Sequence, residues 1–278
     1  MPKKYSKLTT LIACLLVLAL AVGPSGCGEQ AEQTADDATP RKLLLFGVDA
    51  ATWNVLGPML EDGELPVISS LIRSGSSGIL KTGEPIQSPQ MWTSIATGVV
   101  PEKHGILHFM AEIPGTGKEV PVTSNMRKVK AFWNILSEAG ISVGIVGWWP
   151  SCRAEEVNGF MIAQRAWPVN WSRGGVPYGA TRDASGDLQV ESFPGRTYPE
   201  EAYDEFEPFI VTQEDVTVRE MAALFSPNGR YTDANKLFHA RWVYAKDKTF
   251  AEAGLNFLKR YEPDVFAVYL QGTDVVSH

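Results

Sequence analysis

Short apolar runs that alternate with helical patterns restrict the folds open to this sequence of 278 residues. The runs do not alternate apolar with polar residues, which is typical of parallel strands covered on both faces. Between them, apolar residues recur at helical spacing. The pattern predicts an α/β domain with a doubly wound, mostly parallel sheet and helices on both faces. We expect strands at 43–48, 78–82, 143–148, 159–163 and 265–270, and helices at 65–73, 89–97, 129–139 and about 233–261.

Residues 165–231 interrupt this rhythm with many glycines, prolines and aromatic residues. We interpret them as a cap-like insertion over the sheet, with a helix at about 217–224. Long insertions in α/β enzymes often shape the substrate pocket. The domain is therefore expected to span 41–278, with this insertion inside it.

The N-terminus carries the pattern of an export signal. Lys3, Lys4 and Lys7 precede an uncharged run over 8–23, which matches the basic and apolar regions of a signal peptide. A transmembrane anchor is the competing interpretation. The run is shorter than the ~20 apolar residues that cross a bilayer comfortably, so a signal peptide is favoured.

Cys27 follows three small residues at 24–26 (PSG). This context resembles the cleavage box of bacterial lipoproteins, in which the cysteine becomes the lipidated N-terminus. Residues 1–26 are then a lipoprotein-type signal peptide, and the polar, acidic residues 27–40 form a disordered tether. The resemblance implies an exported protein of the bacterial cell envelope. Acylated Cys27 would anchor it to the lipid membrane, on the periplasmic or extracellular face.

The acidity of the chain disfavours one class of partner. The net charge is −7, and removal of residues 1–26, which hold three lysines and no acid, takes it to about −10. A chain this acidic is a poor candidate for binding nucleic-acid polymers through their phosphates. Cys152 would be the one cysteine of the folded part, and a buried apolar role is favoured for it over that of a nucleophile.

Two strand ends carry candidate metal ligands. Asp49 directly follows the run 43–48, and Asp274 and His278 follow the run 265–270. The carboxyl ends of parallel strands form the edge at which α/β sheets bind ligands. An Asp and a His four residues apart can face one metal ion. For Asp49, capping of the helix that follows is an equal alternative.

Ser88 begins a helical pattern, with Pro89 in its first turn. A good helix start is one interpretation. The other is a nucleophile, because a helix N-terminus stabilises the negative charge of an alkoxide. A serine hydroxyl needs a base or a metal ion at neutral pH. Since no Ser-x-x-Lys or Gly-x-Ser-x-Gly pattern surrounds Ser88, metal activation is the remaining route.

Three histidines are not expected to hold the metal. His104 lies in the loop after the Ser88 helix, where bracing of the loop is favoured over ligation. His108 has no supporting context, and His239 falls within the long helix. Trp92, one turn after Ser88, is expected to wall the pocket.

Three stretches, 46–50 (FGVDA), 88–98 (SPQMWTSIATG) and 101–106 (PEKHGI), resemble the type I phosphodiesterase/nucleotide pyrophosphatase branch of the alkaline phosphatase superfamily. The closing stretch, 272–278 (GTDVVSH), is similar to the downstream ligand motif of that family. The resemblance covers 42–164 and 232–278. It implies a metal-dependent enzyme that hydrolyses small phosphoric esters, as a phosphodiesterase or a phosphatase.

The resemblance also implies the role of each candidate residue. Asp49 binds one of two divalent ions, and Ser88 bridges them as the nucleophile. Asp274 and His278 bind the other ion. Carboxylate with His suits Zn²⁺, which is expected first, or Mn²⁺. Ser88 would attack phosphorus in line, and hydroxide would then release the phospho-serine.

One departure from the family pattern concerns the substrate. Animal nucleotide pyrophosphatases hold a phosphoryl oxygen with an Asn where this sequence has Phe109. That contact is absent, which puts nucleotide substrates in doubt. Gln90 or His108 could substitute for the Asn, and Gln90 and Trp92 are the candidate substrate-binding residues.

A second departure concerns the end of the sequence. The family supplies an Asp-His pair and another His downstream of the position of His278. We therefore expect 41–278 to be the N-terminal portion of a longer protein, incomplete at its C-terminus. This chain alone is expected to bind metal poorly and to be weak or inactive.

Other functions fit the same features. A phosphotransferase or phosphomutase of the superfamily would keep the fold and change the reaction. A sulfatase is disfavoured, because the Ser88 stretch lacks the Cys/Ser-x-Pro-x-Arg spacing. A non-catalytic envelope lipoprotein would bind its partner through the aromatic-rich insertion, and Asp49→Ala and Ser88→Ala would leave its function unchanged.

Overall fold

The computed structural model describes residues 42–83, 87–113, 115, 118–151, 153–167, 180–182, 188–190, 195–225 and 234–277. The predicted signal peptide, the tether with Cys27, Cys152 and the candidate ligand His278 lie outside these residues. Within the described ranges, no helix combines the length and apolarity that crossing a bilayer requires.

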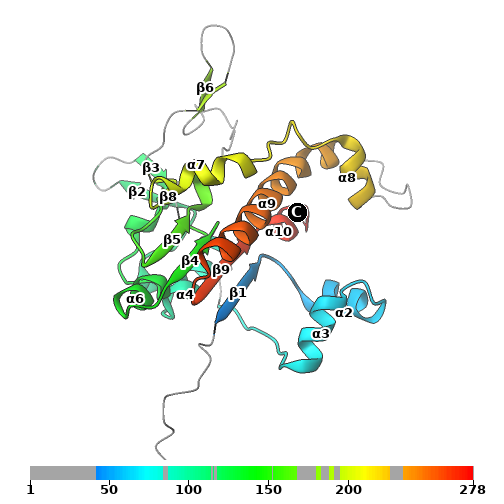
Figure 1. Ribbon diagram of the computed structural model, residues 1–278, viewed down its shortest axis with the longest axis horizontal. Coiled ribbons are helices and arrows are strands. Elements are labelled where there is room, and N and C mark those ends of the chain that lie inside the picture. The colour runs from blue at the N-terminus through cyan, green and yellow to red at the C-terminus, as the bar shows by residue number, and fades with distance from the viewer. Residues whose placement is uncertain are drawn as a thin grey trace, which may run out of the picture. The chain divides into compact units, whose positions relative to one another are not determined.

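A five-stranded sheet organises the described domain, with the strand order β1-β9-β4-β5-β8 (Figure 1). The first four strands in this order run parallel to their neighbours, and β8 pairs antiparallel with β5. The strands are β1 (Leu43–Val48), β4 (Val143–Val146), β5 (Gly159–Ile162), β8 (Thr197–Tyr198) and β9 (Val265–Leu270). This confirms the predicted α/β fold with a mostly parallel sheet.

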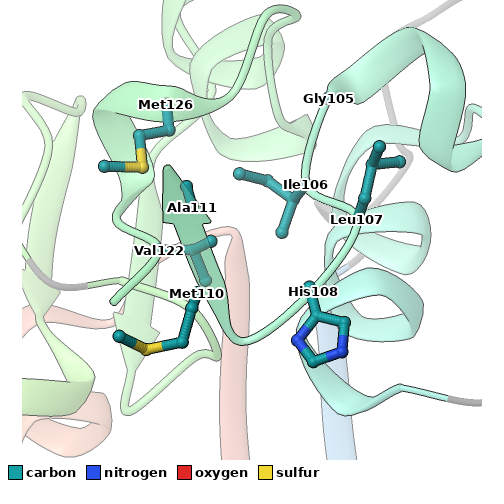
Figure 2. A pocket seen from close by; sticks show the side chains of 8 residues that line it. All are labelled: Gly105, Ile106, Leu107, His108, Met110, Ala111, Val122 and Met126. Atoms are coloured by element: carbon teal, nitrogen blue, oxygen red, sulfur yellow. The ribbon is translucent and has the colours of Figure 1, made fainter. Parts of the chain in front are cut away.

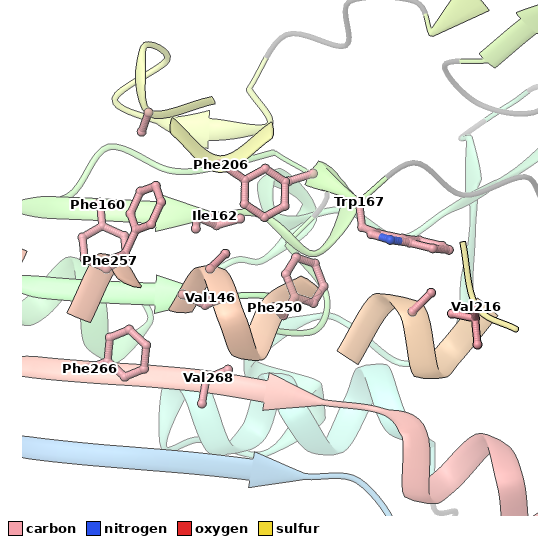
Figure 3. Packing of buried hydrophobic residues seen from close by; sticks show 14 of the residues in the cluster. Val146, Phe160, Ile162, Trp167, Phe206, Val216, Phe250, Phe257, Phe266 and Val268 are labelled. Carbon is pink, nitrogen blue, oxygen red and sulfur yellow. The ribbon is translucent and has the colours of Figure 1, made fainter. Parts of the chain in front are cut away.

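Helices pack on both faces of the sheet. On one face, α9 (Ala234–Tyr261) sets Phe250 and Phe257 into a cluster with Phe160 and Phe266 of the strands (Figure 3). On the other face, α4 (Ser88–Thr97) and α6 (Phe132–Glu138) pack tryptophans against β4 and β9. Both sides of these strands are therefore buried, which explains their continuous apolar sequences.

The described part of residues 165–231, the expected insertion, packs into the same core. Its strand β8 extends the sheet beside β5, and α7 (Ala202–Phe206) buries Phe206 in the α9 cluster. Met221 of α8 (Val218–Phe225) joins that cluster too, which confirms the helix expected at about 217–224. The remaining described elements of the insertion are η2 (Gln164–Ala166), a hairpin of β6 (Ala180–Arg182) with β7 (Leu188–Val190), and η3 (Glu207–Phe209).

Some local predictions were wrong. Residues 78–82 form no strand: Ile79 and Leu80 are 81% and 79% exposed, and no described segment pairs with them. A hairpin of β2 (Met110–Ile113) and β3 (Lys118–Pro121) was not predicted. The stretch expected to be a loop around His104 contains a one-turn helix, α5 (Pro101–His104), and η1 (Ser124–Met126) follows the hairpin.

One side of β1 is open. β1 is an edge strand of the described sheet, and its side chains Leu44, Phe46 and Val48, which share one face, are 49%, 60% and 39% exposed. The two helices that follow, α2 (Trp53–Glu61) and α3 (Pro66–Ser74), contain no buried residue. β1 is thus the least protected strand of the parallel set.

Gly144 shows how closely the sheet and helices approach. It lies in β4, and a Cβ atom there would stand 2.5 Å from Cζ of Phe160 and 3.1 Å from Cδ2 of Phe266. Both rings are fully buried in the α9 cluster, so neither has room to retreat.

We expect Gly144→Ala to lower the free energy of unfolding by about 1–3 kcal/mol, because it overpacks a dense core. Urea denaturation measures the change. Gly57→Ala is the matched control, since Gly57 lies in α2 with nothing within 4 Å of the added Cβ. That variant should be neutral or slightly more stable, because alanine favours a helix. Equal unfolding midpoints for the two variants would contradict this account.

Candidate functional site

Asp49 is fixed at the carboxyl edge of the sheet, where β1 and β9 end together. The two strands pair in parallel from Leu43 with Val265 to Val48 with Leu270. The pairing continues one residue further, because the backbone N–H of Asp49 donates to the carbonyl of Leu270 at 3.0 Å. The side chain that follows β1 therefore lies beside the turn that follows β9.

Both carboxylate oxygens of Asp49 accept a hydrogen bond. The hydroxyl of Tyr269 donates to Oδ2 at 2.7 Å, and the backbone N–H of Ala50 donates to Oδ1 at 3.1 Å. Ala50 has a φ of 53°, in the left-handed region that a non-glycine residue rarely adopts. Strained residues of this kind cluster at functional sites. The oxygens retain lone pairs for a cation.

Tyr269 lies in the electrostatic field of three acidic side chains. Its side chain is almost fully buried. Burial raises the pKa of its hydroxyl first, and the negative charges of Asp49, Asp274 and Asp247 raise that pKa further. The two candidate ligands Asp49 and Asp274 therefore act on one hydroxyl group. Such a concentration of carboxylates at one edge favours a bound cation.

Asp274 lies in the first turn of α10 (Gly272–Ser277), directly after β9. Its backbone N–H donates to the carbonyl of Gln271 at 3.1 Å, which closes that turn. The side chain is half-buried. α10 ends one residue before His278, whose own position is outside the described part of the chain.

Ser88 is the first residue of α4, as predicted, and is half-buried. The ring of Trp92, one turn later, stands 4.6 Å from the ring of Tyr269 and leaves no room for a side chain at Gly47. Ser88 thus begins a helix that packs against Tyr269 through Trp92.

The two predicted substrate-binding residues lie differently from expectation. Trp92 is 9% exposed, inside the core with Trp148 and Tyr269. The structure therefore gives Trp92 a role in packing, where the sequence predicted a contact with substrate. Gln90 is also buried, and its Oε1 atom has no hydrogen-bond partner within the described residues.

His104 braces the segment that follows α4, as the sequence predicted. Its Nε2 atom lies 3.0 Å from Oγ of Ser94, and its Nδ1 atom accepts the backbone N–H of Ile106 at 3.1 Å. The ring is fully buried, and burial lowers its pKa. A neutral ring with its proton on Nε2 satisfies both contacts.

His108 lines a separate pocket of about 170 Å³ next to the β2–β3 hairpin (Figure 2). The other lining residues are small or apolar and include no acid: Gly105, Ile106, Leu107, Met110, Ala111, Val122 and Met126. Phe109, at the position of the family Asn, packs edge-on to His108 with ring centroids 6.0 Å apart. This pocket does not include Asp49, Gln90 or Asp274.

The described residues supply part of a metal site. Asp49 and Asp274 offer oxygen ligands at one edge, which suits a divalent cation. No group of three His, Cys, Asp or Glu side chains gathers within the described ranges. The carboxylates therefore fit the implied ions as a partial ligand set, to which Ser88 and His278 are the candidate additions.

Two charged residues of α9 adjoin this edge and were not predicted. The Nζ atom of Lys246 donates to Oε1 of Gln271 at 2.9 Å, and the carboxylate of Asp247 accepts the backbone N–H groups of Gln271 and Gly272. A sequence signal was present: Lys246 precedes the buried Phe250, Ala253 and Phe257 at helical spacing. A lysine in such an apolar stripe is rarely placed there without a partner.

Lys246 is fully buried, which lowers its pKa to about 8, although the charge of Asp247 raises that pKa and the charge of Arg165 lowers it further. The unfolded chain keeps this proton up to about pH 10. Between about pH 8 and 10 the unfolded state therefore binds more protons, and the folded state gains stability as the pH rises.

We expect the free energy of unfolding to rise between pH 7.5 and 9.5 by about 1–2 kcal/mol more in the wild type than in Lys246→Met. Urea unfolding at the two pH values measures the difference. Lys259→Met, which removes an exposed lysine of the same helix, should keep the wild-type slope. If the free energy of unfolding depends on pH equally in Lys246→Met and in the wild type, Lys246 is not the source of this pH dependence.

Comparison with known proteins places the chain in a family. A search of curated proteins gave no match. Two crystal structures of phosphonoacetate hydrolase from Sinorhizobium meliloti 1021, one in complex with phosphonoformate and one with phosphonoacetate, are similar to 84% of this chain at 15% identity, with TM-scores of 0.45 and 0.44. The chain spans 47% of their length. The family model for type I phosphodiesterase/nucleotide pyrophosphatase matches residues 43–278, and the chain belongs to that family.

Proposed function

We propose that the protein is a metal-dependent hydrolase of small phosphoric esters that uses Ser88 as its nucleophile at a two-metal site. The observation that supports this most is the placement of Asp49 and of the turn that leads to Asp274 at one edge of the sheet, where β1 and β9 end together. Membership of the type I phosphodiesterase/nucleotide pyrophosphatase family agrees with the reaction class.

Asp49 would hold one divalent ion, and Asp274 with His278 would hold the other. When bound, two such ions, with Zn²⁺ expected first and Mn²⁺ as the alternative, neutralise phosphoryl oxygens and lower the pKa of a bound hydroxyl or water. The hydrogen bond from Tyr269 orients Asp49, which is the usual work of a residue behind a metal ligand.

Ser88 would act from the N-terminus of α4. Its Oγ atom attacks phosphorus in line, the ester oxygen leaves, and a phospho-serine forms. Water then attacks the same phosphorus and releases phosphate or a monoester, which restores the serine hydroxyl. The helix start favours the negative charge that Oγ carries before attack.

We also propose that the protein is exported and anchored to the cell envelope through acylated Cys27. The support is the sequence before Cys27, a basic and then apolar segment that ends in small residues. Fractionation tests this: wild-type protein should sediment with membranes, and Cys27→Ser should lose the lipid and leave the membrane fraction. A membrane-bound Cys27→Ser protein would point to an uncleaved transmembrane anchor.

The decisive experiment compares bis-p-nitrophenyl phosphate with p-nitrophenyl phosphate, in the full-length mature protein with added Zn²⁺ or Mn²⁺. We expect metal-dependent hydrolysis that falls at least about 1,000-fold in Ser88→Ala, because the nucleophile is removed. The ratio of the two rates distinguishes a diesterase from a monoesterase.

Two controls define the result. Ser88→Thr keeps a hydroxyl nucleophile and should retain measurable activity. Ser70→Ala removes an exposed serine of α3 and should behave as wild type. Hydrolysis that survives Ser88→Ala would rule out Ser88 as the nucleophile. Bound metal without turnover of either ester would favour the phosphotransferase or phosphomutase reaction.

A further inference from the structure

The start of α10 is held from outside its own helix. The first N–H groups of any helix have no partner within it and need acceptors elsewhere. At α10, Oδ1 of Asp247 accepts the N–H of Gln271 at 3.0 Å, and Oδ2 accepts the N–H of Gly272 at 2.6 Å. One carboxylate of α9 therefore uses both oxygens to hold two consecutive residues of the β9–α10 turn.

Lys246 adds a third contact to the same turn, through its hydrogen bond to the side chain of Gln271 at 2.9 Å. Hydrogen bonds that involve an ionised group are shorter and stronger than neutral ones. Gly272 is suited to this approach, because a Cβ atom there would stand 2.7 Å from Oδ2 of Asp247. The turn and the helix face are thus fitted to each other.

The helix that supplies these side chains is rigidly placed. Phe250, Ala253 and Phe257 of α9 are fully buried and anchor it on the face of the sheet that includes β9. Lys246 and Asp247 lie one turn before Phe250, at the level where β9 ends. The position of the turn therefore follows from the packing of α9.

Asp274 lies two residues after Gly272, the second residue whose N–H group Asp247 accepts. Its backbone N–H donates to the carbonyl of Gln271, whose own N–H is held by Asp247. We infer that Asp247 is a positioning residue, which sets the carboxylate of Asp274 at the correct place relative to Asp49. This inference rests on the proposed function, in which Asp274 holds an ion.

A matched control exists at the other end of β9. Asp264 precedes that strand, and its Oδ2 atom accepts the backbone N–H of Ser142 at 3.0 Å and the hydroxyl of Ser142 at 2.6 Å. Asp264→Asn therefore weakens a similar carboxylate contact on the same strand, at the edge opposite the candidate site. Both Asp→Asn changes keep the shape of the side chain.

The test measures Mn²⁺ binding to the full-length mature protein by calorimetry. We expect Asp247→Asn to raise the Mn²⁺ dissociation constant about 10–100-fold, as the loss of a partner behind metal ligands does. Asp264→Asn should leave it within about twofold. Gly272→Ala would place a Cβ atom 2.7 Å from Oδ2 of Asp247 and should also weaken Mn²⁺ binding. Agreement between the two variants would exclude a folding defect specific to Asp247→Asn as the cause.

Amide hydrogen exchange of residues 271–275 in metal-free protein gives an independent readout. Asp247→Asn should speed exchange there, and Asp264→Asn should not. If the wild type binds Mn²⁺ and Asp247→Asn binds it as tightly as Asp264→Asn does, the inference is overturned while the proposed function stands. If the wild type binds neither Mn²⁺ nor Zn²⁺, the proposed function fails, and equal exchange in the two variants would overturn the positioning role as well.

Discussion

The parallel pairing of β1 with β9 is the constraint on which the candidate site depends. Each strand brings one acidic segment to the same edge of the sheet, although Asp49 and Asp274 are far apart in the sequence. The register decides this outcome, because a slip of one residue would turn Tyr269 to the opposite face of the sheet. Tyr269 then could not reach Asp49, and its ring would leave Trp92.

The site combines three half-buried acids with one fully buried base. Asp49, Asp247 and Asp274 all act on Tyr269, while Lys246 is engaged by Gln271. Carboxylates gathered in a partly desolvated place repel one another unless protons or cations compensate. The fold therefore gathers negative charge at the carboxyl end of β9, where a cation would reduce the repulsion between the carboxylates. The proposed divalent ions would compensate this charge without a large number of arginines or lysines.

Much of the sheet could be predicted from the sequence, because strands that are buried on both faces have continuous apolar sequences. The runs at β4, β5 and β9 are apolar because both faces of these strands are buried, whereas β1 has an apolar run although one of its faces is exposed. The run at 78–82 has the same appearance but lacks a partner strand among the described residues. Pairing is a long-range property, and composition alone does not contain it.

The finer features of the site were harder to predict. The sequence pattern predicted that Asp49, Ser88 and Asp274 lie next to the ends of strands or helices, and the structure places them at those ends. The sequence did not predict that Lys246 and Asp247 bind the turn between β9 and α10, because charged residues in a long helix are usually solvated. The burial of Trp92 was not predicted from the sequence either, because it depends on the absence of a side chain at Gly47.

Because one face of β1 is exposed, the local opening of this strand would be coupled to ion binding at the candidate site. An edge strand with exposed apolar side chains opens locally at a lower free-energy cost than the central strands of the same sheet. The proposed pair of ions, one held by Asp49 and the other by Asp274, would bind together only while β1 is paired with β9. Occupancy would therefore stabilise the docked strand by RT ln(1 + [M]/Kd), and ligand concentration would control how often this edge of the molecule frays.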